Sequence, residues 1–119
     1  MNGDVVLLLA AAEPDASPSL DRITAELARV LGLNHLRVGD PECVIGDGED
    51  FRVWLSFDPD DEEPGLSHPF RLDVATEKGA EVQVGRRLFQ ELADAGRFRV
   101  VLFLDWDCDR STHFSCQDW

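Results

Sequence analysis

Three aspartates in alternation are the residues of this chain whose type and spacing come closest to a chemical site. Asp105, Asp107 and Asp109 directly follow a continuous apolar run, and carboxylates spaced in this way are ligands for hard cations such as Mg²⁺ or Ca²⁺. A calcium loop that began at Asp105 would require glycine at its sixth position and a bidentate glutamate at its twelfth. The chain has Arg110 and Cys116 at these positions. We therefore expect an acidic, solvated strand end instead of a calcium loop.

The pair Asp105 and Asp107 also resembles the nucleophile and acid of haloacid-dehalogenase-type phosphatases, which occupy a D-x-D motif at a strand end. Only twelve residues follow Asp107, which is too few to supply the rest of such an active site. The histidines His35, His68 and His113 lie in three polar segments, and no serine has the G-x-S-x-G context of a nucleophile. We therefore expect no catalytic residues, no enzymatic activity and no cofactor.

A second group of residues has the donor types of a zinc site. Cys108, His113 and Cys116 are close in sequence, and Cys43 would complete a Cys₃His set. Structural zinc sites usually bring cysteines in pairs such as C-x₂-C, whereas the spacings here are C-x₄-H and H-x₂-C. We therefore expect no bound metal and keep these four residues as an alternative zinc hypothesis. A disulfide between Cys108 and Cys116 would order the same segment in an oxidising compartment.

The charge of the chain restricts its partners. The 24 acidic and 11 basic residues give a formal net charge of -13 over 119 residues, which repels nucleic acids and anionic membranes and attracts a basic protein. The segment before Pro14 has no basic start and only a short apolar run, so it predicts neither a signal peptide nor a membrane span. With three cysteines and no targeting segment, a cytoplasmic location is the expectation.

The surrounding sequence predicts the elements that must position these side chains. Apolar residues at a spacing of three and four predict one helix that ends at Gly32 and a second that ends at Gly96. Two continuous apolar runs, over residues 5–12 and 98–104, predict strands that are buried on both faces. These two helices and two strands form the framework of the predicted domain.

The segments between these elements are more polar. Strict alternation over residues 51–57 and 70–74 predicts two strands with one buried face, joined by the acidic loop 58–68. Residues 36–48 fit either a short edge strand or an irregular connection. Residues 105–119 are expected to form an acidic tail that contains cysteines and aromatics.

The order β-α-(β)-β-β-α-β predicts a single α+β domain over residues 1–119, with a ferredoxin-like two-layer arrangement. Both helices would cover one face of a mainly antiparallel sheet. The first and last predicted strands would be neighbours, so their second face would form an apolar patch. This patch requires cover from Trp106, Phe114 and Trp119 of the tail, from a second copy, or from another protein.

The acidic segments and an outward-facing tryptophan lead to the main functional hypothesis. An acidic surface with exposed aromatics suits a protein that masks a basic surface, such as that of a nuclease toxin. Small bacterial immunity proteins and antitoxins are similar in size and charge. The alternative is a ferredoxin-like regulatory or small-molecule-binding domain that forms a homodimer through its first and last strands. The residues predicted to contact the partner are Trp54, Asp58, Asp60, Asp61, Glu62, Glu63, Asp105, Asp107 and Asp109.

Overall fold

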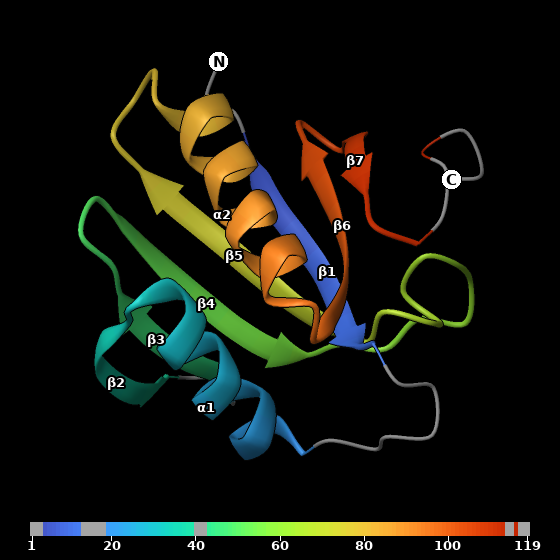
Figure 1. Ribbon diagram of the computed structural model, residues 1–119, viewed down its shortest axis with the longest axis horizontal. Helices are drawn as coiled ribbons and strands as arrows, with labels where there is room; N and C mark the ends of the chain where they lie inside the picture. The colour runs from blue at the N-terminus through green and yellow to red at the C-terminus, as the bar shows by residue number, and fades with distance from the viewer. Residues whose placement is uncertain (1–3, 13–18, 40–42, 114–115, 117–119) are drawn as a thin grey trace.

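The computed structural model describes residues 4–12, 19–39, 43–113 and 116. These residues form two helices and one antiparallel sheet (Figure 1). Within these residues seven strands follow the spatial order β2-β3-β4-β5-β1-β6-β7, and every neighbouring pair is antiparallel. With its two helices, this sheet confirms the predicted α+β class. The strands are β1 (Val5–Ala11), β2 (Asn34–Gly39), β3 (Cys43–Asp47), β4 (Phe51–Phe57), β5 (Phe70–Thr76), β6 (Phe98–Leu104) and β7 (Asp107–Ser111).

The helices α1 (Leu20–Leu31) and α2 (Glu81–Ala95) lie on the same face of the sheet (Figure 1). The hydroxyl of Ser19 accepts a hydrogen bond of 3.2 Å from a first-turn N–H and caps α1. Both helices end as predicted, at Gly32 with a φ of 67° and at Gly96 with a φ of 69°, because a left-handed cap residue favours glycine. Neither helix in the described part of the chain is long and apolar enough to span a membrane.

The main core lies between the helices and the sheet. Leu7 on β1, Leu102 on β6 and Leu88 on α2 are each 0% exposed, and full burial of a leucine contributes about 1.5–3 kcal/mol. A glycine inside α2 allows the close approach to the sheet, since a Cβ at Gly85 would lie 3.0 Å from Cγ1 of Val5. The core therefore fixes α2 across β1 and β6.

A smaller apolar cluster lies on the opposite face of the sheet. Val6 of β1 and Val101 and Phe103 of β6 are 2%, 0% and 9% exposed, and Leu8 and Cys108 pack against them. This cluster confirms that the first predicted strand and the strand over residues 98–104 are apolar on both faces. The three side chains are buried within one chain, so a second copy is not needed to cover them.

The structure differs from the prediction at both edges of the sheet. Residues 107–111 form β7 and not part of a tail, because a two-residue turn returns the chain along β6. At the other edge, residues 34–39 and 43–47 form two strands, where the sequence is equally compatible with an irregular connection. Edge strands such as β2, exposed along nearly all of its length, need no apolar alternation and give little signal. The sheet consequently has more strands than the predicted arrangement.

Candidate functional site

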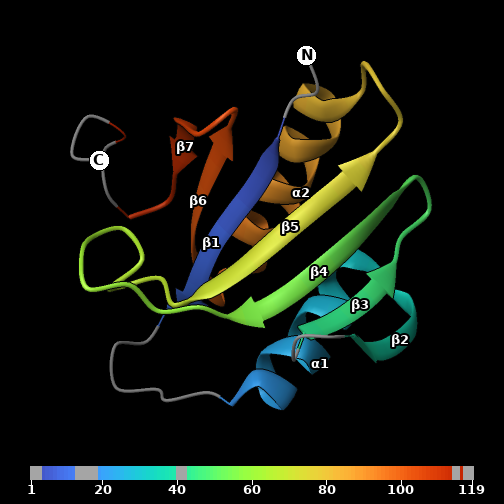
Figure 2. The same cartoon turned by 180° about the vertical axis from the view of Figure 1, so that it is seen from behind.

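Figure 2 shows the sheet face turned away from both helices, called the open face here. This face carries the predicted aromatic contact Trp54 of β4. Its neighbours in β4, Val53 and Leu55, belong to the core under the helices, so strand alternation places Trp54 on the open face. Across the sheet Trp54 pairs with Asp73 of β5, and Asp73 pairs with Val6 of β1. The half-buried indole of Trp54 therefore borders the polar centre of the open face.

Arg71 of β5 connects three segments on the open face. Its Nε and Nη2 donate hydrogen bonds of 3.0–3.2 Å to the carboxylate of Asp73. Its Nη1 lies 3.9 Å from Oδ2 of Asp58, at the start of the acidic loop. Its guanidinium carbon lies 5.1 Å from the ring centroid of Trp106, which is cation–π distance. Arg71 thereby links β5 to the acidic loop and to the β6–β7 turn.

A pocket of about 260 Å³ opens beside Arg71. Valines of β1 and β5, two carboxylates, one guanidinium and one indole form its walls. The indole of Trp106 is 55% exposed. We call this site the Trp106 pocket, and its lining residues are Asp4, Val5, Val6, Arg71, Asp73, Val74 and Trp106.

The β6–β7 turn holds Trp106 in an unusual backbone conformation. Asp105 and Trp106 have φ values of 51° and 67°, and they join the paired residues Leu104 and Asp107. Two positive φ values are typical of a type I′ turn, which favours Asn-Gly and disfavours a bulky residue. Two hydrogen bonds tie the turn to the chain before β1: Asp105 N–H donates to Asp4 O at 2.9 Å, and Asp4 N–H donates to Asp105 Oδ1 at 3.0 Å.

The acidic loop, residues 58–68, is anchored by a buried histidine. The imidazole of His68 is 0% exposed, and its Nδ1 lies 2.8 Å from Ser67 Oγ and 3.1 Å from Pro64 O. Burial lowers the pKa of His68 below its usual value, which favours the neutral form of the ring. The N–H of Asp58 closes the base of the loop with a hydrogen bond of 2.7 Å to Pro69 O. The exposed acidic residues of this loop are Asp58, Asp60, Asp61, Glu62 and Glu63.

Most of the carboxylates of the acidic loop carry no compensating charge. Asp60 Oδ1 accepts a hydrogen bond of 2.7 Å from the N–H of Asp61, and Glu63 Oε1 accepts one of 2.6 Å from the N–H of Ser67. In the described part of the chain, no arginine or lysine forms an ion pair with any acidic residue between Asp60 and Glu63. Their charge is therefore directed to solvent.

Other acidic residues are neutralised by arginines of the same chain. The side-chain hydrogen bonds of these arginines lower the pKa of each carboxyl below its usual value. One of the three, Asp109, is a predicted partner contact that instead joins β7 to α2, whereas Asp105 and Asp107 remain exposed. The pairs are Asp47 with Arg52 and Arg37, Asp50 with Arg87, and Asp109 with Arg86 at 2.9–3.0 Å.

The structure does not bring the four residues of the zinc hypothesis together. Cys108 and Cys116 form a disulfide with a Cα–Cα distance of 5.4 Å, so their sulfurs are bonded to each other. Cys43 lies on β3, and four strands separate β3 from β7 in the sheet. His113 directly follows a residue that bonds β6, since the hydroxyl of Thr112 accepts the N–H of Val100 at 3.0 Å. Among the described residues no three His, Cys, Asp or Glu side chains are grouped to hold a metal.

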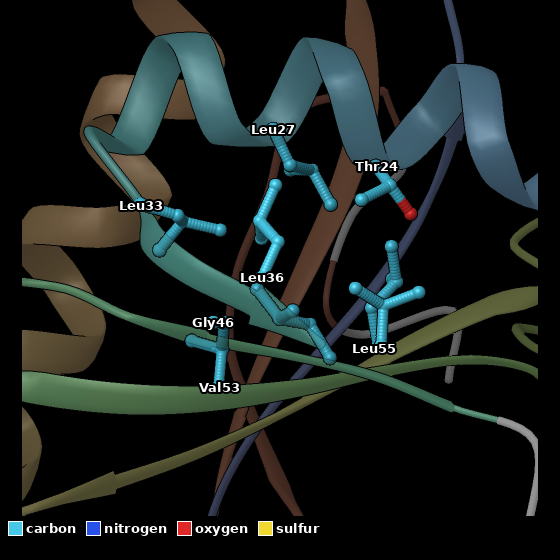
Figure 3. Close-up of a pocket in the computed structure, with 9 residues that line it drawn as sticks. Thr24, Leu27, Leu33, Leu36, Gly46, Val53 and Leu55 are labelled. Atoms are coloured by element: carbon cyan, nitrogen blue, oxygen red, sulfur yellow. The ribbon is translucent and has the colours of Figure 1, made fainter. Parts of the chain in front are cut away.

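A gap between α1 and the β3–β4 region is too small for a ligand (Figure 3). Its volume is about 10 Å³, which is the space of about one water molecule. Thr24 and Leu27 of α1 face Leu36, Val53 and Leu55 across it. The gap is part of the core and not of a functional site.

Sequence reasoning missed the Trp106 pocket. Alternation correctly places Arg71 and Asp73 on the polar face of their strand, whereas the sequence predicts Trp106 only as cover for an apolar patch. Two facts that assemble the pocket are non-local: β5 lies next to β1, and a tight turn brings Trp106 to Arg71. Neither fact has a signal in the periodicity of the sequence.

The chain has no match among protein-family models, curated proteins or solved structures.

Proposed function

We propose that this protein is a small acidic interaction module that binds a basic partner protein through its open face and acidic loop. The observation that carries the proposal is that the acidic loop, with its uncompensated carboxylates, adjoins the open face through the Asp58–Arg71 pair, where Trp54 is half-buried and Trp106 is exposed. Tryptophan is a frequent energetic centre of interfaces. Surrounding charges accelerate encounter and select partners of opposite sign.

The net charge of -13 supports the same assignment. Part of the negative charge is neutralised by ion pairs within the chain, in which Asp47, Asp50 and Asp109 bind arginines. The acidic loop keeps its charge free and is held in place by buried His68. A rigidly anchored loop loses less conformational entropy on binding than a free one, which suits a protein that must recognise a partner.

We propose further that the partner is a basic enzyme such as a nuclease toxin, and that the chain masks its nucleic-acid-binding surface in the manner of an immunity protein or antitoxin. The support is electrostatic: a surface that binds nucleic acid is positively charged, and the acidic loop with Asp105 and Asp107 offers the complementary charge. Nothing in this proposal requires a catalytic residue or a cofactor in this chain.

The inner part of the sheet supports a proposed ferredoxin-like relationship. Strands β4-β5-β1-β6 with α1 and α2 follow a split β-α-β order, and β2, β3 and β7 extend this unit at its two edges. For the alternative function, a homodimer through β1 and β6, both strands already pair on both sides. A dimer would therefore use faces or the outer edges, and light scattering at tens of micromolar tests it.

Charge reversal in the acidic loop tests the proposed function. Asp61→Lys with Glu62→Lys should lower the association rate constant for the partner about tenfold at low salt, because steering depends on the field of the acidic surface. The difference should disappear near 1 M salt, where the Debye length is about 3 Å. The partner is obtained by co-purification from the native host or as the product of the adjacent gene, and rates are measured by surface-based kinetics.

The matched control is Glu77→Lys with Glu91→Lys. Glu77 is exposed in the turn before α2 and Glu91 is exposed on α2, and the pair changes the net charge by the same amount. If both pairs slow association equally, only net charge matters and the loop is not the contact surface. If the loop pair leaves the rate unchanged, the proposed mechanism is wrong.

A further inference from the structure

The Trp106 pocket has the chemistry of a site for one cationic side chain. Its carboxylates belong to Asp4 and Asp73, and those of Asp58 and Asp105 lie beside it. Against these four carboxylates stands the single guanidinium of Arg71, a formal balance of -3. Its volume of about 260 Å³ is below the roughly 300–1,000 Å³ of pockets that enclose drug-sized ligands. A single side chain fits this size and charge.

The aromatic wall of the pocket already contacts a guanidinium. The guanidinium carbon of Arg71 lies 5.1 Å from the ring centroid of Trp106, and the same guanidinium pairs with Asp73. The indole of Trp106 therefore already binds a cation of its own chain. The carboxylate of Asp4 accepts no hydrogen bond from another described residue. It therefore remains available as an acceptor for a ligand.

The backbone of the turn adds an independent argument. A tryptophan with a φ of 67° at a turn position that favours glycine is conformationally unfavourable. The side chain is also 55% exposed, so burial in the core does not offset the unfavourable backbone conformation. Residues held in such sparsely populated backbone conformations cluster at ligand-binding and active sites.

We propose that the Trp106 pocket receives an arginine side chain of the basic partner, with the guanidinium against Trp106 and bound by the carboxylates of Asp4 and Asp73. Arginine suits this pocket better than lysine, because a planar guanidinium both stacks on an indole and bridges two carboxylates. This inference rests on the proposed function and names the contact that would centre the interface.

The test is an NMR titration of the ¹⁵N-labelled protein with N-acetyl-arginine methylamide. We expect saturable shifts of the Trp106 indole N–H and of the Asp4 and Asp73 amides, with a dissociation constant in about the millimolar range for so small a ligand. The Trp106 signal is assigned by its absence in Trp106→Gly. Equal shifts with the neutral N-acetyl-alanine methylamide, or equally tight binding of the lysine analogue, would overturn the assignment.

Three variants distinguish a cation site from an anion site. Trp106→Gly suits the turn, so it should fold at least as stably while binding of the arginine analogue is lost. Asp73→Asn should weaken binding about tenfold, since a charged hydrogen bond is removed. Arg71→Gln should strengthen it about fivefold, because the resident cation no longer competes. If Arg71→Gln instead abolishes binding and phosphate shifts the same signals in the unmodified protein, the pocket is an anion site and the proposal is wrong.

The pocket and the proposed function fail in different experiments. If Asp61→Lys with Glu62→Lys slows association with the partner but Trp106→Gly does not weaken the complex, the acidic module stands and the pocket proposal is overturned. If the arginine analogue binds in the pocket but the loop charges have no effect on partner association, the pocket stands as a cation site and the proposed function is wrong.

Discussion

The acidic loop and the β6–β7 hairpin both present carboxylates, and the structure uses them differently. In the loop, the side chains between Asp60 and Glu63 form no ion pair with the described residues, and the loop is held from within by His68. In the hairpin, Asp109 pairs with Arg86 of α2, Asp105 accepts the N–H of Asp4, and a disulfide holds Cys108. The carboxylates of the loop are unpaired and the loop is held by buried His68, whereas the hairpin is held in place partly by the ion pair of Asp109 with Arg86.

This difference shows why the number of acidic residues does not give the strength of the negative electrostatic field at the surface. A carboxylate that is bonded to an arginine of the same chain contributes little to the field that an approaching partner meets. Three acidic residues of this chain, Asp47, Asp50 and Asp109, have lowered pKa values for this reason. The acidic loop, in contrast, concentrates four exposed carboxylates between Asp60 and Glu63 that no described arginine or lysine pairs.

The largest expected effect is the loss of the loop anchor. His68→Ala removes a fully buried ring together with its contacts to Ser67 and Pro64, so we expect the free energy of unfolding to fall by about 2–3 kcal/mol. Urea unfolding measures this change. An unfolding free energy within about 0.5 kcal/mol of the unmodified protein, the range of ordinary surface substitutions, would show that the loop does not depend on His68.

The same residue gives a pH dependence with a defined sign. Burial lowers the pKa of His68 in the folded protein below the value of 6.5 expected for the unfolded chain. The unfolded state therefore binds a proton first, and stability that is complete above about pH 6.5 declines as the pH falls toward the folded-state pKa. His68→Ala should remove this part of the decline. If both proteins lose the same stability between about pH 7 and 5, the range in which an ordinary histidine titrates, His68 does not cause it.

The second effect concerns the anchor of the hairpin. Replacing Cys108 and Cys116 by serine opens a short covalent loop, with a separation of 8 residues, and should lower the free energy of unfolding by about 2 kcal/mol. Dithiothreitol should destabilise the unmodified protein by the same amount and leave the double variant unchanged. A thiol assay under denaturing conditions should detect one free thiol, that of Cys43, before reduction and three afterwards. Three thiols before reduction would contradict the disulfide.

The fold class and the main elements are predictable because their signals are local. Periodicity locates both helices, and glycine with positive φ marks their ends at Gly32 and Gly96. The apolar strands predicted over residues 5–12 and 98–104 have a neighbouring strand on each side in the sheet. The acidic loop is correctly placed between two half-exposed strands. The edge strands give no such signal, since β7 has the polar sequence DCDRS and is defined by its pairing with β6.

The candidate site is less accessible to sequence reasoning because its contacts are long-range. The sequence does not distinguish carboxylates that form ion pairs within the chain from those that remain unpaired. Asp109 is paired because β7 packs beside α2, where Arg86 donates to it. His68 stands in a polar segment, although it is fully buried. Trp54 is correctly placed on the open face, whereas the residues of the Trp106 pocket come together from segments as distant as Asp4 and Asp105.

The smallest expected effect is the difference in melting temperature between variants of a paired and an unpaired carboxylate in the hairpin. Asp109→Asn weakens the contact with Arg86, and because Arg86 is 45% exposed and screened by solvent, we expect a fall in melting temperature of only about 1–4 °C. Asp107→Asn, at an exposed neighbouring position without an ion pair to a described residue, is the matched control and should leave the melting temperature unchanged.

The pH dependence of this pair of variants sharpens the comparison between hairpin and loop. The pKa of Asp109 is lowered in the folded state from its ordinary value of 3.8, so its contribution is present above that value and is lost as the pH falls through the folded-state pKa. The two variants should therefore differ at neutral pH and converge in acid. Equal melting temperatures at neutral pH would mean that the pair with α2 contributes nothing to stability, and that the hairpin does not use the charge of Asp109 to fix its position.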